Sequence, residues 1–566
     1  MRQIVRRTVP DAATVLTAAG VHPVLARVFA ARGVASADDL GCDLASLPRH
    51  TTMKGIEAAA ARLADAILHR EKVVIVADYD ADGATACAVA VRGLGALGAI
   101  VDFLVPNRFE YGYGLTPEIV AQAAALAPRL IVTVDNGIAS HDGVAAAVAS
   151  GIEVLITDHH LPAATLPSPA LIVNPNQGGC AFPGKHLAGV GVMFYVLLAT
   201  RALMRERGSF AGRPEPNLGT LLDLVALGTV ADVVRLDRTN RTLVAQGLAR
   251  IRAGRAQPGL SALFSVAGRD PRRATSYDLG FVAGPRLNAA GRLSDMTVGI
   301  RCLLADGEGT AAPLAVELDR LNRERREVES AMQEAAVLAV ESGARHAAGD
   351  DAYTVCLYDP DFHQGVIGIV AGRLKERYHR PAVVFAKGSN GELKGSGRSI
   401  AAFHLRDALD LAAKRAPGVI TRFGGHAFAA GVSIVESGLA CFQDVFESIA
   451  REHLSSADLA RTIDSDGTLA PGELGVELAA ALREQVWGQG FPAPLFDDTF
   501  SVLAQRTVGG SHSKLSLARG AERFDAILFR HIDALPPSIR VAYRPELNEW
   551  RGEVSLELVI EHWQLA

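Results

Sequence analysis

Between residues 71 and 175 the chain alternates short apolar runs with longer alanine-rich stretches. Each run is rich in β-branched side chains, which is typical of strands buried on both faces of a sheet. The longer stretches have the composition of helices, so the alternation predicts βαβ units and a parallel sheet. The predicted strands are VVIVADYD (73–80), IVDFLVP (100–106), LIVTVDNG (130–137), EVLITDHH (153–160) and ALIVNP (170–175).

The pattern changes after residue 310. Leu314, Leu318 and Leu321 recur at helical spacing among many Arg and Glu residues, which predicts one long amphipathic helix connecting two lobes. A second α/β segment follows, with YTVCLYDP and PAVVFAKG as strands, and alternating strands near the C-terminus favour a five-stranded barrel. We therefore predict an N-terminal helical extension (1–50), a catalytic α/β domain (51–310), a connector helix (311–345), a second α/β domain (346–455) and a barrel (456–566).

Composition narrows the class of protein. A chain of 566 residues is too long for one hydrophobic core, and 49% hydrophobic with 21% charged residues is typical of globular domains. The net charge of −5 argues against a generally basic coat for nucleic acid, although it allows a local basic groove. The six cysteines form no CxxC pair, and we find neither a signal peptide nor a run that could span a bilayer. We expect a soluble, cytoplasmic protein with no membrane partner.

Acidic side chains gather where the predicted strands end. The carboxyl ends of parallel strands meet at one edge of a sheet, where ligands bind, so these side chains are expected to converge. Converging carboxylates repel one another and need cations. Oxygen-rich sets with histidine suit Mn²⁺ or Mg²⁺, and this many ligands predicts two ions sharing one carboxylate, as in phosphoryl chemistry. The candidates are Asp78, Asp80, Asp82, Asp135, Asp158, His159 and His160, together with Asp232 after a later apolar run.

The alternative is structural. An isolated DxD on a loop is usually a turn or a helix N-cap, and Asp158 could likewise be a cap beside a surface histidine. Three such clusters at successive strand ends make coincidence a poor explanation, so we favour the metal site.

The same motifs resemble a known family. DYDADG (78–83), VDNG (134–137), DHH (158–160) and Asp232 are similar to the four motifs of DHH phosphoesterases. That resemblance implies a DHH domain, a DHHA1-type second domain and an OB-like barrel. Further motifs resemble the RecJ family of single-stranded-DNA-specific 5′→3′ exonucleases, namely PNRFEYGYGL (106–115), GPRLNAAGR (284–292), FHQGVIGIVAGRL (362–374), KGSGRS (394–399) and RFGGHAFAAG (422–431). The chain departs from the family at Arg235, where proline is usual, and at FHQG (362–365), where the family's more familiar form contains tryptophan.

The resemblance implies roles for individual residues. Asp135 would bridge two Mn²⁺ or Mg²⁺ ions, and His160 would contact the scissile phosphate. In the second domain His426 would lie against the phosphate, the adjacent glycines would allow close approach of backbone, and His363 would face the same region. The implied metal ligands are Asp78, Asp80, Asp82, Asp135, His159 and Asp232, and the implied glycines are Gly424 and Gly425.

The resemblance also implies how a 5′ end is held. Arg108, Ser396 and Arg398 match positions that bind the terminal phosphate, and arginine forks suit a dianion. Arg286 and Asn288 match positions that contact the DNA backbone. Any single arginine has the alternative of a solvated charge or an ion pair. We expect a narrow channel to exclude duplex DNA, with stacking on Phe109, Tyr111 or Tyr113, for which core packing is the alternative.

The leading hypothesis is a metal-dependent exonuclease that degrades single-stranded DNA from the 5′ end to mononucleotides. By resemblance it would act in recombination and mismatch repair with a single-strand-binding protein and a helicase, plausibly as a monomer. One alternative is a DHH phosphodiesterase for short oligonucleotides or cyclic dinucleotides. Another is a non-catalytic DHH scaffold that binds DNA, although such scaffolds lose metal ligands that this chain keeps.

Overall fold

The computed structural model describes residues 3–107, 113–341, 352–388, 391–549 and 552–566, and the backbone of residue 550. Its contacts divide the chain into two compact units. One unit contains residues 4–319 and 464–566, and the other contains residues 320–463 with the first three residues.

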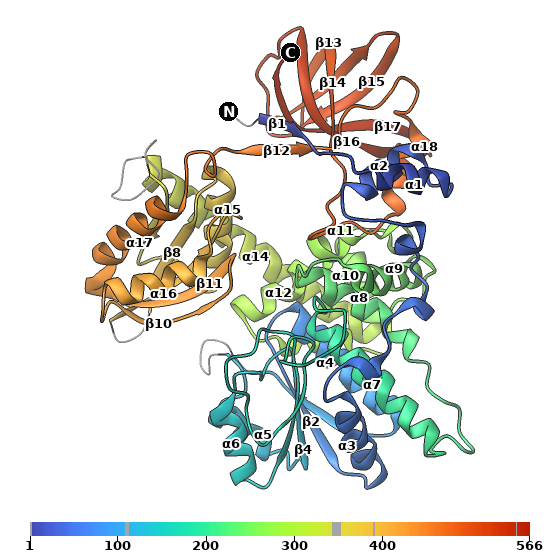
Figure 1. The fold of residues 1–566 in the computed structure, drawn as a ribbon, viewed down its shortest axis with the longest axis vertical. Coiled ribbons are helices and arrows are strands. Elements are labelled where there is room, and N and C mark those ends of the chain that lie inside the picture. The colour runs from blue at the N-terminus through green and yellow to red at the C-terminus, as the bar shows by residue number, and fades with distance from the viewer. Residues whose placement is uncertain (1–2, 108–112, 342–351, 389–390, 551) are drawn as a thin grey trace. The chain divides into compact units, whose positions relative to one another are not determined.

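The larger unit is built on a five-stranded parallel sheet of strand order β3-β2-β4-β5-β6 (Figure 1). This confirms the predicted parallel sheet. Each strand ends before the polar residues of its run, because those residues leave the sheet to form loops at its carboxyl edge. The strands are β2 (Lys72–Ala77), β3 (Ile100–Leu104), β4 (Leu130–Val134), β5 (Glu153–Thr157) and β6 (Leu171–Val173).

Helices cover both faces of this sheet (Figure 1). Helices α5 (Pro117–Ala124) and α6 (His141–Ala149) pack on one face over Val74, Ile131 and Ile156, which are all fully buried. The other face carries α3 (Ile56–Leu68), α4 (Ala81–Leu97) and α7 (Gly189–Glu206). Beyond α4 lies a further helical layer, in which α8 (Leu222–Ala231), α12 (Gly284–Leu293) and α13 (Thr297–Leu303) contact α4. In the same layer, α9 (Arg238–Arg252) packs on α8, and α10 (Pro258–Val266) packs on α13.

The C-terminal part of this unit is a closed five-stranded barrel, as the sequence predicts. Its neighbouring strands are antiparallel except for one parallel pair, β15 with β17. Helix α18 (Val476–Glu484) packs against β16 and β17. The barrel strands are β13 (Phe496–Val508), β14 (His512–Arg519), β15 (Glu522–Leu528), β16 (Ser538–Trp550) and β17 (Glu553–Leu565).

The N-terminal segment is attached to the residues that lead into the barrel. It contains the helices α1 (Ala12–Ala18) and α2 (Pro23–Ala30), and also a strand, β1 (Gln3–Arg6), that pairs with β12 (Thr462–Ser465). Arg32 forms an ion pair with Asp466 at 2.7 Å, and the two side chains are only 1% and 2% exposed. Removing one partner of such a buried pair leaves an uncompensated charge, at a cost of about 3–5 kcal/mol.

The smaller unit is a five-stranded sheet of order β10-β11-β9-β8-β7 with helices on both faces. Helices α16 (Leu405–Arg415) and α17 (Leu439–His453) cover one face. The other face packs against α15 (Ile367–Tyr378) and the end of the long helix α14 (Glu308–Glu341), which confirms the predicted amphipathic helix. The strands are β7 (Val355–Tyr358), β8 (Ala382–Lys387), β9 (Glu392–Arg398), β10 (Ile420–Gly425) and β11 (Ala429–Val435).

Within the described part of the chain, a search for a membrane span finds no helix with the length and apolar character required.

Candidate metal centre

Acidic and histidine side chains from four segments meet at the carboxyl edge of the parallel sheet. Three of the segments follow β2, β4 and β5, as the sequence predicts. The fourth segment contributes Asp232, the C-cap of helix α8, so the apolar run before this residue is a buried helix and not a strand. Three overlapping groups have ligand atoms within 4.8 Å of one another, namely Asp78, Asp80 and Asp135; Asp82, His159 and Asp232; and Asp135, His159 and His160.

Asp135 belongs to two of these groups, which is the position expected for a bridging carboxylate. Its backbone has φ 62°, in the left-handed region that few residues other than glycine adopt. The Asn136 side chain holds this turn by donating hydrogen bonds to the carbonyl oxygens of Val76 and Val134 at 3.1 and 2.9 Å. Gly189 is also required, because a Cβ there would lie 2.6 Å from the Asp135 Cβ. No pattern in the sequence points to Gly189.

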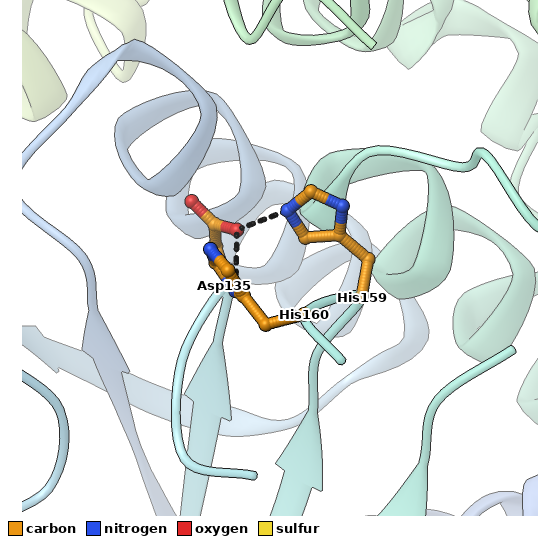
Figure 2. A group of neighbouring side chains, drawn as sticks. All are labelled: Asp135, His159 and His160. Carbon is orange, nitrogen blue, oxygen red and sulfur yellow. Dashed lines mark ion pairs between the residues drawn. The ribbon is translucent and has the colours of Figure 1, made fainter. Parts of the chain in front are cut away.

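Two buried atoms of the centre face each other without forming a hydrogen bond. Asp135 Oδ1 lies 3.1 Å from His159 Nε2 and 4.0 Å from His160 Nδ1, and Figure 2 shows the carboxylate facing both imidazole rings. Neither Asp135 Oδ1 nor His159 Nε2 has a hydrogen-bond partner in the described structure. Buried polar atoms are almost always hydrogen-bonded, so this exception indicates a missing partner that accepts electron pairs from both atoms. A metal ion fits that description.

The carboxylates after β2 are also helix caps. Asp80 is the N-cap of α4 and accepts a hydrogen bond from the Gly83 amide at 3.0 Å. Asp82 accepts from the amides of Gly189 and Val190, at the start of α7, at 2.6 and 2.9 Å. The N-cap alternative is therefore correct for Asp80, but it does not exclude metal binding, because a carboxylate has more lone pairs than these contacts use.

Burial and mutual repulsion oppose ionisation of the carboxyl groups in this centre. Burial and the charge of Asp232 raise the pKa of Asp82 to about 7. Burial and the charge of Asp80 raise the pKa of Asp232 to about 8. The pKa of Asp135 is raised well above its ordinary value by burial and by Asp82. These carboxyl groups cannot all ionise at neutral pH without cations among them, so the donor set fits divalent metal.

The two adjacent histidines have different electrostatic environments. Burial and the nearby charge of His160 lower the pKa of His159, which favours the neutral imidazole that a metal ligand requires. Burial alone would lower the pKa of His160, but its 2.8 Å hydrogen bond and ion pair with Asp158 raise that pKa to about 9. Asp158 therefore favours the cationic form of His160.

Asp158 orients this histidine pair. Its carboxylate also accepts hydrogen bonds from the amides of Ile138, His159 and His160 at 2.9, 2.7 and 3.1 Å. Burial would raise the pKa of Asp158, but the hydrogen bond from His160 and the charges of both histidines bring it below the ordinary value. The pKa of Asp158 therefore favours an ionised carboxylate, which holds His160 in place through their hydrogen bond.

Tyr113 reaches the centre with its hydroxyl group. The hydroxyl donates to the Asp135 carbonyl oxygen at 3.2 Å and lies 3.2 Å from His160 Nδ1, while the residue as a whole is 46% exposed. Sequence reasoning considered this residue only for stacking or core packing and missed the contact. Three other predicted residues, Arg108, Phe109 and Tyr111, lie outside the described residues.

Two residues predicted to contact the DNA backbone already have intramolecular partners. Asn288 Oδ1 accepts from the Ala81 amide at 2.9 Å, beside the metal-binding loop. Arg286 is 8% exposed, pairs with Asp319 at 2.8 Å and donates to the Val282 carbonyl oxygen at 2.7 Å. Contact with DNA stays a prediction for both residues.

The smaller unit carries the remaining predicted residues. Arg398 donates to the Ser396 hydroxyl at 3.2 Å, and burial lowers the pKa of the arginine. A Cβ at Gly368, in the first turn of α15, would lie 2.9 Å from Ser396 Oγ and 3.0 Å from the Arg398 guanidinium. These three residues form a compact polar group. His363 is exposed in the loop before α15, and Gly424, Gly425 and His426 are exposed at the end of β10. The catalytic and binding roles of these residues stay predictions.

Three family models match the chain, described as the DHH family N-terminal domain over residues 72–229, the DHHA1 domain over 350–452 and the RecJ OB domain over 465–562. The chain is 47% identical over 573 residues to the single-stranded-DNA-specific exonuclease RecJ of Escherichia coli, covering 99% of this chain and 98% of that protein. It is 49% identical to the protein of the same name from Dickeya dadantii, over 96% of each chain.

Solved structures agree with these sequence matches. The crystal structure of RecJ in complex with Mn²⁺ from Thermus thermophilus matches with a TM-score of 0.83 and 32% identity, over all of this chain and 79% of that one. The Mg²⁺ complex from the same organism matches with a TM-score of 0.76 and 30% identity, over all of this chain and 78% of that one. The chain therefore belongs to the RecJ family of DHH proteins.

Proposed function

We propose that this protein hydrolyses single-stranded DNA from its 5′ end to mononucleotides, using two Mn²⁺ or Mg²⁺ ions. The observation that carries the proposal is the pair of buried atoms without hydrogen-bond partners, Asp135 Oδ1 and His159 Nε2, at the junction of the ligand groups. Relatives named as single-stranded-DNA-specific exonucleases, and their complexes with Mn²⁺ and Mg²⁺, support it. The proposed ligands are Asp78, Asp80, Asp82, Asp135, His159 and Asp232.

The side chains of the centre have separate tasks. Ions bound there would lower the pKa of a water molecule and offset charge on the attacking and leaving oxygens. Asp135 belongs to two of the three ligand groups, and His159 offers a neutral nitrogen. His160, held as a cation by Asp158, is suited to donate a hydrogen bond to a non-bridging phosphate oxygen. Tyr113 restrains both the Asp135 backbone and His160.

The preference for a 5′ end is proposed to reside in the smaller unit. Ser396, Arg398 and the first turn of α15 at Gly368 offer a hydroxyl, a half-buried guanidinium and backbone amides to one anion. Arg108 would join them, while His363 and His426, next to Gly424 and Gly425, would contact the scissile phosphate.

The wider setting is part of the same proposal. We place the enzyme in the cytoplasm as a monomer that acts in recombination and mismatch repair with a single-strand-binding protein and a helicase. The phosphodiesterase alternative does not account for the OB domain at residues 465–562. The scaffold alternative does not account for a complete set of ligand groups.

The first prediction concerns direction and metal dependence. With Mn²⁺, a 5′-labelled single strand should release labelled mononucleotide at once, a 3′-labelled strand should shorten gradually, and blunt duplex should persist. Asp135→Asn should lower the rate by more than about a hundredfold, because losing even a residue that hydrogen-bonds to a metal ligand lowers metal affinity or activity by about 10–100-fold. Asp142→Asn, an exposed change on α6, is the control and should leave the rate unchanged. Release of the 3′ label first, or activity in excess chelator, would contradict the proposal.

The second prediction concerns pH and stability without metal. The pKa values of Asp82 and Asp232 are raised above that of an unfolded Asp, which is about 3.9. The stability that these groups contribute is therefore fully present below about pH 4 and is lost as pH rises through about 7 to 8. Mn²⁺ replaces the protons, so it should raise Tm more at pH 8 than at pH 6.

Asp135→Asn is the matched variant for this measurement. Asparagine tolerates the positive φ at this position, and the substitution removes one buried charge. The metal-free variant should melt at a higher temperature than the wild type at pH 8 and should respond little to Mn²⁺. An equal effect of Mn²⁺ at both pH values, or an unchanged response in the variant, would be inconsistent with the proposed centre.

The third prediction concerns the 5′ phosphate. Wild-type protein should degrade a 5′-phosphorylated strand with a higher kcat/KM than a 5′-hydroxyl strand. Arg398→Ala should reduce that preference by about tenfold or more, since hydrogen bonds to charged groups contribute about 1.5–3 kcal/mol. Arg377→Ala, which removes an exposed ion pair with Glu341, is the control and should keep the preference. An Arg398→Ala variant that discriminates as well as the wild type would exclude this residue from end recognition.

A further inference from the structure

Two stacked aromatic side chains are exposed on the larger unit. The rings of Tyr277 and Phe281 lie 4.8 Å apart between centroids with an interplanar angle of 24°. The two residues are 57% and 64% exposed. Large aromatic side chains usually contribute to a core or an interface, so an exposed stacked pair indicates a binding surface.

The local backbone holds this pair in place. A short helix, α11 (Ser276–Asp278), continues into a π-helical turn (Leu279–Ala283) and then into α12. The Gly284 amide donates to the Leu279 carbonyl oxygen, five residues earlier, and Pro285 next to it has no amide hydrogen to continue a regular helix. Single π-turns inside helices are frequent at functional sites. Here the turn carries Phe281.

The helix that follows the rings leads to the metal centre. Gly284 and Asn288, four residues apart on α12, share one face of that helix directly after the turn that carries Phe281. A Cβ at Gly284 would lie 3.1 Å from the Cβ of Ala231, the residue before Asp232.

Further along α12, Asn288 accepts a hydrogen bond from the Ala81 amide, between Asp80 and Asp82. Gly284, three residues after Phe281, lies about 6 Å from Asn288 along the helix axis, for four residues at about 1.5 Å each. The aromatic pair is therefore a short distance from the site where a phosphodiester bond would be cut.

Exposed arginines lie in the same region as the pair. Arg272, five residues before Tyr277, is exposed. The Ser276 hydroxyl donates to the Trp487 carbonyl oxygen at 2.6 Å, and the exposed Arg235 lies against the same segment, because a Cβ at Gly490 would be 2.5 Å from its Cγ. Exposed guanidinium groups attract a phosphate backbone, and exposed aromatic faces stack on its bases.

We propose that Tyr277 and Phe281 form a stacking platform for a nucleobase of the single-stranded substrate, a few nucleotides from the bond that is hydrolysed. This inference rests on the proposed exonuclease function and adds a binding subsite to it. Because every base has an aromatic face, the platform tolerates any sequence. Holding one base fixes the strand relative to the metal centre, so that each cycle of hydrolysis brings the next base onto the rings.

Abasic substrates test the platform directly. A set of single strands, each with one abasic nucleotide at a successive position from the 5′ end, is bound to the metal-free protein and Kd is measured by fluorescence anisotropy. In the wild type, one position should weaken binding by about tenfold, the range expected for one base stacked on aromatic rings. The double variant Tyr277→Ala/Phe281→Ala should bind an intact strand about tenfold more weakly, with no further loss at that position.

Two matched variants complete the design. Tyr277→Phe/Phe281→Tyr keeps both rings and should bind as the wild type does. Leu68→Ala truncates a 70% exposed apolar side chain at the end of α3 and should leave Kd unchanged. A 5′-phosphorylated dinucleotide is too short to place a base on the platform, so its hydrolysis with Mn²⁺ reports on the metal centre alone. The rate of nucleotide release from it should be equal in all variants.

The outcomes separate the two proposals. The platform would be overturned if abasic substitution weakened binding further in the double alanine variant at every position, or if that variant bound the intact strand with wild-type affinity. In either case, release of a nucleotide from the dinucleotide would still support the exonuclease proposal. Failure of the wild type to release any nucleotide would instead overturn the exonuclease function. A wild-type dimer in sedimentation that the double variant loses would assign the rings to self-association and also overturn the platform.

Discussion

The mutual repulsion of buried carboxylates around Asp135 is the constraint on which the rest of the site depends. Asp78, Asp82 and Asp135 are each no more than 6% exposed, and burial raises the pKa of Asp82 and Asp135. The fold offsets part of this charge with the amides at the start of α7, which hydrogen-bond to Asp82, and with the cationic His160. The remaining charge has to be offset by metal ions, so the same acids that destabilise the metal-free fold create its affinity for divalent cations.

The proposed chemistry is divided along the chain. We propose that the loops of the parallel sheet and α8 supply the metal ligands and that the smaller unit supplies a half-buried arginine and serine for a terminal phosphate, while the barrel belongs to a recognised OB domain. Each part has its own sheet or barrel, and the two sheets have separate hydrophobic cores. Degradation of a strand from one end needs hydrolysis, recognition of that end and retention of the remaining strand.

Much of the metal centre follows from local sequence. Apolar runs ending in Asp78, Asp135 and Asp158 predict a convergence at one sheet edge, because parallel strands share the direction of their carboxyl ends. The apolar run before Asp232 also made it a candidate, but that run is the buried helix α8, so no strand of the sheet places this residue. The tight approach of Gly189 to Asp135 depends on how α7 packs against the strand loops, which no local pattern encodes.

Features that depend on solvent exposure could not be predicted from the sequence either. The hydroxyl of Tyr113 and the stacked rings of Tyr277 and Phe281 look like ordinary core aromatics until tertiary packing shows which atoms remain at the surface. The barrel illustrates the same limit, because alternating strands predict five members but not the parallel pairing of β15 with β17 that closes it.

We propose that one carboxylate, Asp135, joins two metal ions. The decisive experiment is titration of the metal-free protein with Mn²⁺, followed by electron paramagnetic resonance. A bridged pair should give two ions per chain whose spectrum shows exchange coupling, and that coupling should be lost in Asp135→Asn. A single bound ion, or two ions with the spectra of isolated Mn²⁺, would contradict it.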